Sequence, residues 1–374
     1  MNRLFDRSSI SVKPLSERKN KLDFKQDRID PDAYAPRLGA DAAERVARAV
    51  AEIRAARSKG APVILAFGAH AIKNGLSPVM IRLMKGGWVT HFATNGAGVI
   101  HDWEFAYQGR SGEDVQRYVA EGQFGIWQET GCFLNLALAV GAYRRLGYGE
   151  SVGALVAEDG LPIPCKEELA AAMAAGVTSS DETVLARAAA AADLAALLVR
   201  FGVAPGFLRV EHPFKAYGLQ AAAYRAGVPF TAHPMFGHDI IYTHPMNCGA
   251  AVGRTAERDF LSFTDSVSRL EGGVYLSVGS AVMSPMIFEK ALSMSRNVAR
   301  VRGGVVENFS IFVVDLAKSE WDWVRNGEPP QDNPAYYLRF CKTFSRMGGR
   351  MSYTSADNRS FLVALLRELE GARD

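Results

Sequence analysis

Short runs of apolar residues, each closed by small or polar residues, recur along the chain at 62–67, 88–93, 208–210, 228–232, 273–278 and 309–314. Runs of this length are typical of strands buried on both faces of a parallel sheet. Helical spacing appears between them, as in 41–59, where Val46, Val50 and Ile53 share one face. Further helices are predicted at 77–84, 112–146 with an interruption near 122–125, 166–200 with a break near 177–181, 285–295, 334–346 and 358–370. This alternation predicts an α/β fold with a doubly wound, mostly parallel sheet.

The domain organisation follows from the same pattern. Residues 1–38 are polar and irregular, and we expect an extended N-terminal arm that packs on another subunit or is disordered. Residues 39–374 are predicted to form a single α/β domain with a helical insertion at about 150–205.

Composition excludes several classes of protein. The 43 basic and 40 acidic residues give a net charge of +3, too even to favour nucleic acid or an anionic membrane as a partner. No apolar run approaches the ~20 residues of a membrane span, and the first residues lack the apolar core of a secretory signal. The four cysteines form no C-x-x-C pair, which fits the reducing cytoplasm.

The candidate chemistry gathers at the turns after the predicted strands. Small residues there let a ligand approach the backbone, and backbone N–H groups can hold phosphate or ribose. The sequence therefore predicts a dinucleotide site at Gly68, Ala69, Asn95, Gly96, Gly98, Gly279, Ser280 and Ala281. The alternative is three tight turns that serve packing alone, since no strict G-x-G-x-x-G is present.

Histidines cluster near the same strand ends. Three of the seven precede proline, which favours extended backbone, so each is expected to end a strand and turn toward one rim of the sheet. His70, Lys73, His233, His238 and Asp239 are the predicted substrate-binding residues. A metal held by His233 and His238 with His70, His101 or Asp102 stays open as an alternative, although no standard metal-ligand spacing is present.

Several segments, in this order, resemble the deoxyhypusine synthase family. They are Leu65-Ala-Phe-Gly-Ala-His-Ala-Ile-Lys-Asn-Gly-Leu76, Thr94-Asn-Gly-Ala-Gly-Val-Ile-His-Asp102, Gly273-Val-Tyr-Leu-Ser-Val-Gly-Ser-Ala-Val282, Pro334 eight residues before Lys342, and Ser355-Ala-Asp357. The resemblance implies a Rossmann-like domain that binds NAD, with Thr94 and Asp357 among the cofactor contacts. It also implies a tetramer, and an imine formed on Lys342 after hydride transfer.

The substrate-binding residues of that family are largely missing. Its paired glutamates correspond to Ile100 and His101, and only Asp239 matches the family's later aspartate. A polycation needs several carboxylates to offset its desolvation, so we expect a different substrate. Residues 67–104 are also similar to an NAD-dependent ornithine cyclodeaminase family.

The sequence thus predicts an NAD-dependent enzyme, a transferase or deaminating enzyme, that acts on an amine or amino-acid carbon through an imine. His101 and Asp102 are expected to transfer a proton, with Lys342 as nucleophile and Lys73 as its competitor. The alternatives are an ornithine cyclodeaminase-like enzyme, a metal-dependent hydrolase and a catalytically silent scaffold.

Overall fold

The computed structural model describes residues 3–371, and these cluster into two compact units built from interleaved segments. Unit 1 comprises residues up to 26, 99–225 and 234–259, and unit 2 comprises 27–98, 226–233 and 260 onward. The sequence predicted one domain from residue 39. The three segments of unit 1 alternate along the chain with those of unit 2, and the predicted helical insertion at about 150–205 lies within segment 99–225 of unit 1.

Unit 2 contains a six-stranded sheet in which every neighbouring pair is parallel. Its strands are β2 (Val63–Phe67), β3 (His91–Thr94), β7 (Phe230–Ala232), β8 (Val274–Val278), β9 (Ser310–Asp315) and β10 (Arg350–Ser355). The spatial order is β10-β9-β8-β2-β3-β7, which is the 3-2-1-4-5-6 order of a doubly wound fold read from the other edge. The predicted fold class is confirmed.

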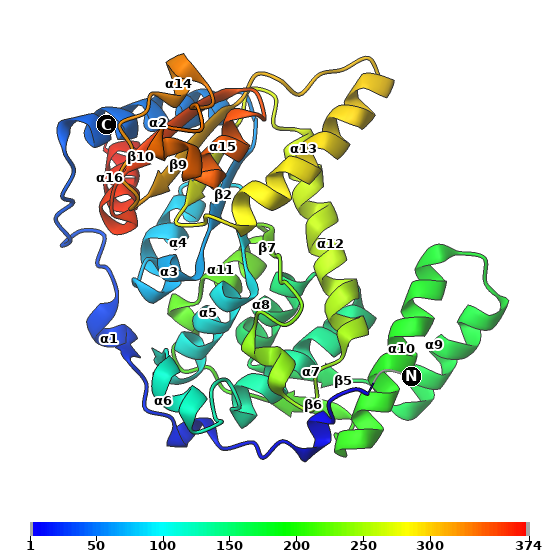
Figure 1. Ribbon diagram of the computed structural model, residues 1–374. Coiled ribbons are helices and arrows are strands. Elements are labelled where there is room, and N and C mark those ends of the chain that lie inside the picture. Colours follow the sequence, from blue (N-terminus) through cyan, green and yellow to red (C-terminus); the bar gives the residue numbers. More distant parts are fainter. Residues whose placement is uncertain (1–2, 372–374) are drawn as a thin grey trace. The chain divides into compact units, whose positions relative to one another are not determined.

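Helices cover both faces of this sheet (Figure 1). Contacts of the sheet with α2 (Ala40–Ser58) and α16 (Asn358–Glu370), and of α16 with α4 (Ser77–Lys85), define one layer. On the other face, Phe263, Phe288 and Phe344 join the side chains of Tyr275 and Ile311 in a buried apolar cluster. These aromatic residues come from α12 (Gly249–Ser268), α13 (Met283–Val301) and α15 (Arg339–Ser345). Burial on both faces explains the uninterrupted apolar runs of the central strands.

Unit 1 is mainly helical. Its central helix, α7 (Gln128–Arg144), is buried along most of its length and contacts α8 (Tyr148–Glu158) and α10 (Glu182–Phe201). α10 forms an antiparallel hairpin with α9 (Lys166–Thr178) (Figure 1). The other elements are α1 (Phe24–Asp27), α5 (Gly96–Gln108), α6 (Val115–Ala120), α11 (Leu219–Ala226), and the strand pairs β1 (Leu22–Asp23) with β4 (Arg110–Ser111) and β5 (Gly160–Ile163) with β6 (Gly206–Arg209). In unit 2, α3 (Ala69–Lys73) and α14 (Trp323–Asn326) complete the helices named here.

One predicted strand belongs to another sheet, and one strand was missed. Residues 208 and 209 of the predicted run lie in β6, which pairs antiparallel with β5 in unit 1, so His212 does not follow a strand of the parallel sheet. β10 was missed because its sequence, Arg-Met-Ser-Tyr-Thr-Ser, is largely polar. It is an edge strand paired only with β9, and an edge position demands less apolar character than a central one.

The N-terminal arm packs against other segments of its own chain. Leu15 and Phe24 are almost fully buried, and the Lys13 N–H donates to the Ile126 carbonyl at 3.3 Å. The strand β1 pairs with β4. The arm therefore contributes Leu15 and Phe24 to the core of unit 1, whereas its packing on another subunit stays a prediction.

Candidate functional site

The predicted cofactor-binding turns converge at the carboxyl edge of the sheet in unit 2. β2 and β8 are neighbours there, although β3 and β7 lie between them in the sequence. The turn after β2 touches the turn after β8: a Cβ on Gly68 would lie 2.2 Å from the Gly279 carbonyl oxygen. In a doubly wound sheet, this point where the strand order reverses is the place where ligands bind.

The other two turns join them through side chains. The hydroxyl of Thr94, the last residue of β3, donates to the Phe67 carbonyl at 2.9 Å. The Asn74 amide, after α3, donates to the Asn358 side chain at 3.1 Å, and Asn358 begins α16 directly after Asp357. The structure thus brings together four segments that the sequence separates by up to 290 residues.

Packing alone explains some of the small residues. Gly68 has no room for a side chain, and a Cβ on Gly98 would lie 2.2 Å from the Thr94 hydroxyl. Gly279 differs, because its φ of +59° favours glycine while a Cβ would meet only the Asn358 amide, at 3.5 Å. Of these three glycines, only Gly279 is set by backbone conformation rather than by crowding.

The remaining cofactor residues lie in the same turns. Asn95 is half-buried and accepts from the Gly98 N–H at 2.9 Å, so it caps the start of α5, which begins at Gly96. The Ser280 hydroxyl accepts from the Ser284 N–H, while Ala69 is half-buried and Ala281 exposed. Asp357 caps α16 and pairs with Arg359 at 2.8 Å, and this hydrogen-bonded pairing lowers its pKa.

Asp315 is an acidic group that the sequence analysis missed. It is the last residue of β9, beside Ser355 of β10, and its half-buried carboxylate accepts from the Ala317 N–H at 3.0 Å. In dinucleotide-binding folds, an acid at the end of the second strand accepts hydrogen bonds from ribose. The sequence did contain a signal for this residue: an aspartate ends the strand that comes after the Gly279 turn and the helix following that turn.

The predicted substrate residues divide between the two units. In unit 2, His70 is exposed and Lys73 half-buried on α3. His233 is 7 % exposed, and its Nε2 lies 3.0 Å from the Thr231 hydroxyl. In unit 1, His238 is exposed and Asp239 half-buried. Their binding roles stay predictions.

His233 belongs to a buried polar cluster with His91. The His91 Nδ1 lies 2.8 Å from the Ser266 hydroxyl, and its Nε2 lies 3.0 Å from the Thr231 hydroxyl. Burial lowers the pKa of each imidazole to about 3, so both are neutral at physiological pH. His91 is the first residue of β3, and its two hydrogen bonds join this strand to β7 and α12.

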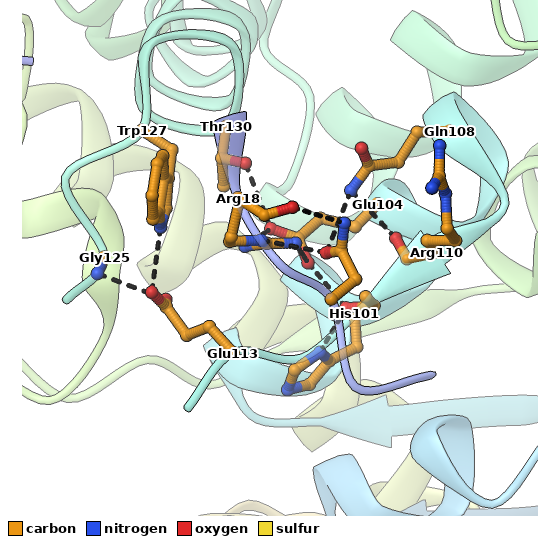
Figure 2. Close-up of polar contacts among 11 residues, drawn as sticks. Arg18, His101, Glu104, Gln108, Arg110, Glu113, Gly125, Trp127 and Thr130 are labelled. Atoms are coloured by element: carbon orange, nitrogen blue, oxygen red, sulfur yellow. Dashed lines mark hydrogen bonds and ion pairs between the residues drawn. The ribbon is translucent and has the colours of Figure 1, made fainter. Parts of the chain in front are cut away.

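His101 and Asp102 follow each other on α5, and adjacent helical residues point in different directions. Asp102 is buried, and its carboxylate accepts from the backbone N–H groups of Leu219 and Gln220, each at 3.0 Å, at the start of α11. The acid linked to His101 through a hydroxyl is Glu104, three residues further on the same helix (Figure 2). Their spacing of three was the available signal, since residues three apart share a helix face.

Lys342 lies on α15 in an aromatic setting, as expected. Its Nζ is 3.6 Å from the centre of the Tyr336 ring and 4.0 Å from the Glu328 Oε1. Both contacts suit an ammonium group, whereas an imine-forming lysine must be neutral. The nucleophilic role of Lys342 stays a prediction.

Two further properties bear on the alternatives. Within residues 3–371, no three His, Cys, Asp or Glu side chains lie close enough together to hold a metal ion. Across the same part of the chain, no helix has the length and apolar character needed to cross a bilayer.

Comparisons with known proteins show distant structural similarity. No protein-family model and no curated protein sequence matches the chain. Among solved structures, a ternary complex of AgrE with ornithine and NAD+ is similar at 12 % identity and a TM-score of 0.40, covering 90 % of this chain. ArgZ, an arginine dihydrolase from the ornithine-ammonia cycle in cyanobacteria, is similar at 14 % identity and a TM-score of 0.41, covering 87 % of this chain. The chain spans 34 % and 32 % of those two structures.

A conserved protein of Methanococcus maripaludis S2 that carries the LOR/SDH name is similar at 12 % identity and a TM-score of 0.41. The match covers 96 % of this chain and 76 % of that one. None of these three structures is described as a deoxyhypusine synthase.

Proposed function

We propose that the carboxyl edge of the sheet in unit 2 binds NAD, and that the protein is an NAD-dependent enzyme acting on an amine or amino-acid carbon. The meeting of the Gly68 and Gly279 turns at the point where strand order reverses carries this proposal. The resemblance of the same turns to deoxyhypusine synthase and ornithine cyclodeaminase supports the cofactor and the nitrogen-bearing substrate. Deoxyhypusine synthesis itself is not proposed, because most polycation-binding carboxylates are missing from the sequence.

The residues at this edge fit a dinucleotide in chemical type. The left-handed backbone at Gly279 carries no side chain of its own, and the Asn358 amide, 3.5 Å from where a Cβ would lie, is the one neighbouring group among the described residues, so a ligand could approach there closely. The segment from Asn95 to Gly98 opens a helix of 13 residues, whose N-terminus favours a negatively charged group. Asp315 would accept hydrogen bonds from the adenosine ribose, whereas Asp357 is engaged with Arg359 and α16.

When bound, NAD would supply a hydride acceptor for oxidation of the substrate carbon that bears nitrogen. That oxidation also releases the proton of the amine nitrogen and leaves an imine, which water would hydrolyse or a second amine would take over. His101 is the candidate for the proton, because a neutral imidazole can take one up near physiological pH. Lys342, with its ammonium-type contacts, is the candidate for binding an anionic group or, when neutral, for holding the imine.

NAD binding by the purified full chain tests the proposal, followed calorimetrically with NAD and NADP in parallel. We expect NAD to bind at least about tenfold more tightly than NADP, because Asp315 would repel the extra phosphate of NADP. Asp315→Asn should reduce that preference, whereas Asp332→Asn, at an exposed aspartate of the same region, should not. No detectable binding at millimolar NAD would overturn the proposal.

Turnover can be sought in the same preparation by absorbance at 340 nm. L-ornithine, L-arginine and spermidine separate an amino acid from a polyamine as substrate. A rise in absorbance at 340 nm with spermidine alone would indicate chemistry of the deoxyhypusine synthase type.

A further inference from the structure

The half-buried His101 of unit 1 is connected to a buried carboxylate through one hydroxyl group (Figure 2). The His101 Nδ1 lies 2.7 Å from the Ser111 hydroxyl oxygen, and that hydroxyl lies 2.5 Å from the Glu104 Oε2. Ser111 and Glu104 are 0 % and 1 % exposed. In the chain His101–Ser111–Glu104, the two partners of His101 are therefore shielded from solvent.

Glu104 is held as a carboxylate. Arg18, from the N-terminal arm, donates to both carboxylate oxygens, at 2.8 and 2.7 Å, in a fork geometry that suits a carboxylate. The Thr130 hydroxyl lies 3.0 Å from the Oε1. Burial alone would raise the pKa of Glu104, but the charge and hydrogen bonds of Arg18 outweigh it and hold that pKa below its ordinary value.

These contacts leave one arrangement of protons. An ionised carboxylate only accepts hydrogen bonds, so the single Ser111 proton must point at Glu104. The Ser111 oxygen then offers only lone pairs to His101, and the Nδ1 at 2.7 Å must carry the hydrogen between them. A neutral imidazole with hydrogen on Nδ1 has none on Nε2.

We infer that Arg18, Glu104 and Ser111 are positioning residues that fix His101 in the tautomer protonated at Nδ1, so that His101 takes up and releases its proton at Nε2. The catalytic meaning of this tautomer rests on the proposed function, in which His101 transfers a proton. The tautomer itself is a property of the free protein.

The inference assigns the N-terminal arm a role in setting the tautomer of His101. Arg18 lies 86 residues from Glu104 in the sequence, and its guanidinium also lies 5.9 Å from the centre of the Trp127 ring. Trp127 in turn donates to Glu113 at 2.9 Å (Figure 2). The arm thus supplies the charge that keeps Glu104 ionised and therefore sets the direction of the Ser111 hydroxyl.

Nitrogen-15 NMR of the histidine side chains tests this inference without cofactor or substrate. Protonated and unprotonated ring nitrogens resonate far apart, and His101→Gln identifies the His101 signals. The spectra are recorded at a pH where the imidazole is neutral. In the natural chain we expect hydrogen on Nδ1 alone.

Two substitutions should change the tautomer in different ways. In Ser111→Ala the constraint is lost, and the Nε2-protonated form should appear. In Glu104→Gln an amide N–H can donate to Ser111, which frees the Ser111 proton to turn toward Nδ1 and moves the hydrogen of His101 to Nε2. Ser111→Thr keeps the hydroxyl and should keep the natural tautomer.

His212 serves as the internal control. Its Nε2 accepts from the Trp103 indole N–H at 3.1 Å, so it also carries its hydrogen on Nδ1, yet it has no part in the Ser111 chain. Its signals should stay the same in all variants. If Glu104→Gln fails to fold because Arg18 loses its partner, the two Ser111 variants, which keep that ion pair, still decide the question.

Hydrogen on Nε2 of His101 in the natural chain would overturn the inference, as would an unchanged tautomer in a folded Ser111→Ala variant. Because these measurements involve no NAD, their failure leaves NAD binding untouched. A failure of NAD binding in turn leaves the tautomer result valid.

Discussion

Two histidine clusters in this protein both pair imidazoles with hydroxyl groups, but they differ in burial and in whether an ion pair is present. In unit 2, His91 and His233 share the Thr231 hydroxyl in a fully buried cluster without a carboxylate partner. In unit 1, His101 is half-buried and reaches a buried ion pair through Ser111. The first arrangement keeps its imidazoles neutral and joins two strands of the sheet to a helix, while the second orients an imidazole. The neighbours of a histidine therefore decide its role, and its position after a strand does not.

The largest expected effect on stability comes from the buried ion pair of Arg18 and Glu104 in the His101 cluster. Arg18→Met leaves the Glu104 charge buried without its partner, and we expect a loss of about 3–5 kcal/mol in the free energy of unfolding. Replacing both partners, as Arg18→Met with Glu104→Leu, should recover most of it, because no unpaired charge remains. Denaturant titration measures both values.

Arg269→Ala is the control, since Arg269 lies directly after α12 and forms an exposed pair with Asp265 in the last turn of that helix. It should cost less than about 1 kcal/mol. A similarly small cost for Arg18→Met would contradict a buried, ionised Glu104.

The neutral cluster should respond to acid instead. The pKa of His91 and of His233 is about 3 in the folded chain, against 6.5 for the unfolded chain, so the unfolded state binds more protons between these values. Stability is therefore complete above pH 6.5 and falls as the pH drops toward 3, by about 1.4 kcal/mol per pH unit for each histidine. At pH 5 the pair would account for a loss of about 4 kcal/mol.

Unfolding free energies measured from pH 7 to pH 5 check this slope. His233→Asn should reduce it by the share of one histidine. His212 and His244, each with a pKa lowered to about 4 by burial, add a decline of the same sign in unit 1. An equal slope in the His233→Asn variant would show that the cluster is not the source.

The smallest effect is expected at the rim of the sheet. Gly68→Ala forces a Cβ against the Gly279 carbonyl, and we expect a loss of about 1–3 kcal/mol from overpacking, together with weaker NAD binding. Gly253→Ala, on α12 with open space around it, should stabilise the chain by about 0.5–1 kcal/mol. Thermal unfolding with and without NAD measures both. A neutral Gly68→Ala would mean that the two turns do not approach as closely as described.

The central strands could be predicted from the sequence because burial on both faces leaves a local mark. The ends of β2, β3, β8 and β9 lie within three residues of the ends of the apolar runs that predicted them. β10, at the edge, lacks that mark, and β6 carries it in part while pairing elsewhere. An apolar run predicts a strand, but nothing within the run specifies the partner or the direction of pairing.

The candidate site shows the same division. The residues of the sheet rim could be found because each follows a recognisable strand end, and parallel strands deliver their carboxyl ends to one edge. Arg18 and Ser111 were missed because a polar residue in the N-terminal arm or in a two-residue strand carries no periodic signal. Asp315 was missed although it closes a predicted strand, because an acidic residue at a strand end does not by itself indicate ribose binding.

The amino-acid pattern alone determined the α/β character, the position of the main strands and the turns that meet at the rim. The tertiary structure decided that Gly68 lies against Gly279, that Asp102 caps a helix, and that Arg18 neutralises Glu104. The physical reason is the range of the forces involved. Backbone conformation and hydrophobic periodicity act over a few residues, whereas ion pairs and close packing join residues that only the folded chain brings together.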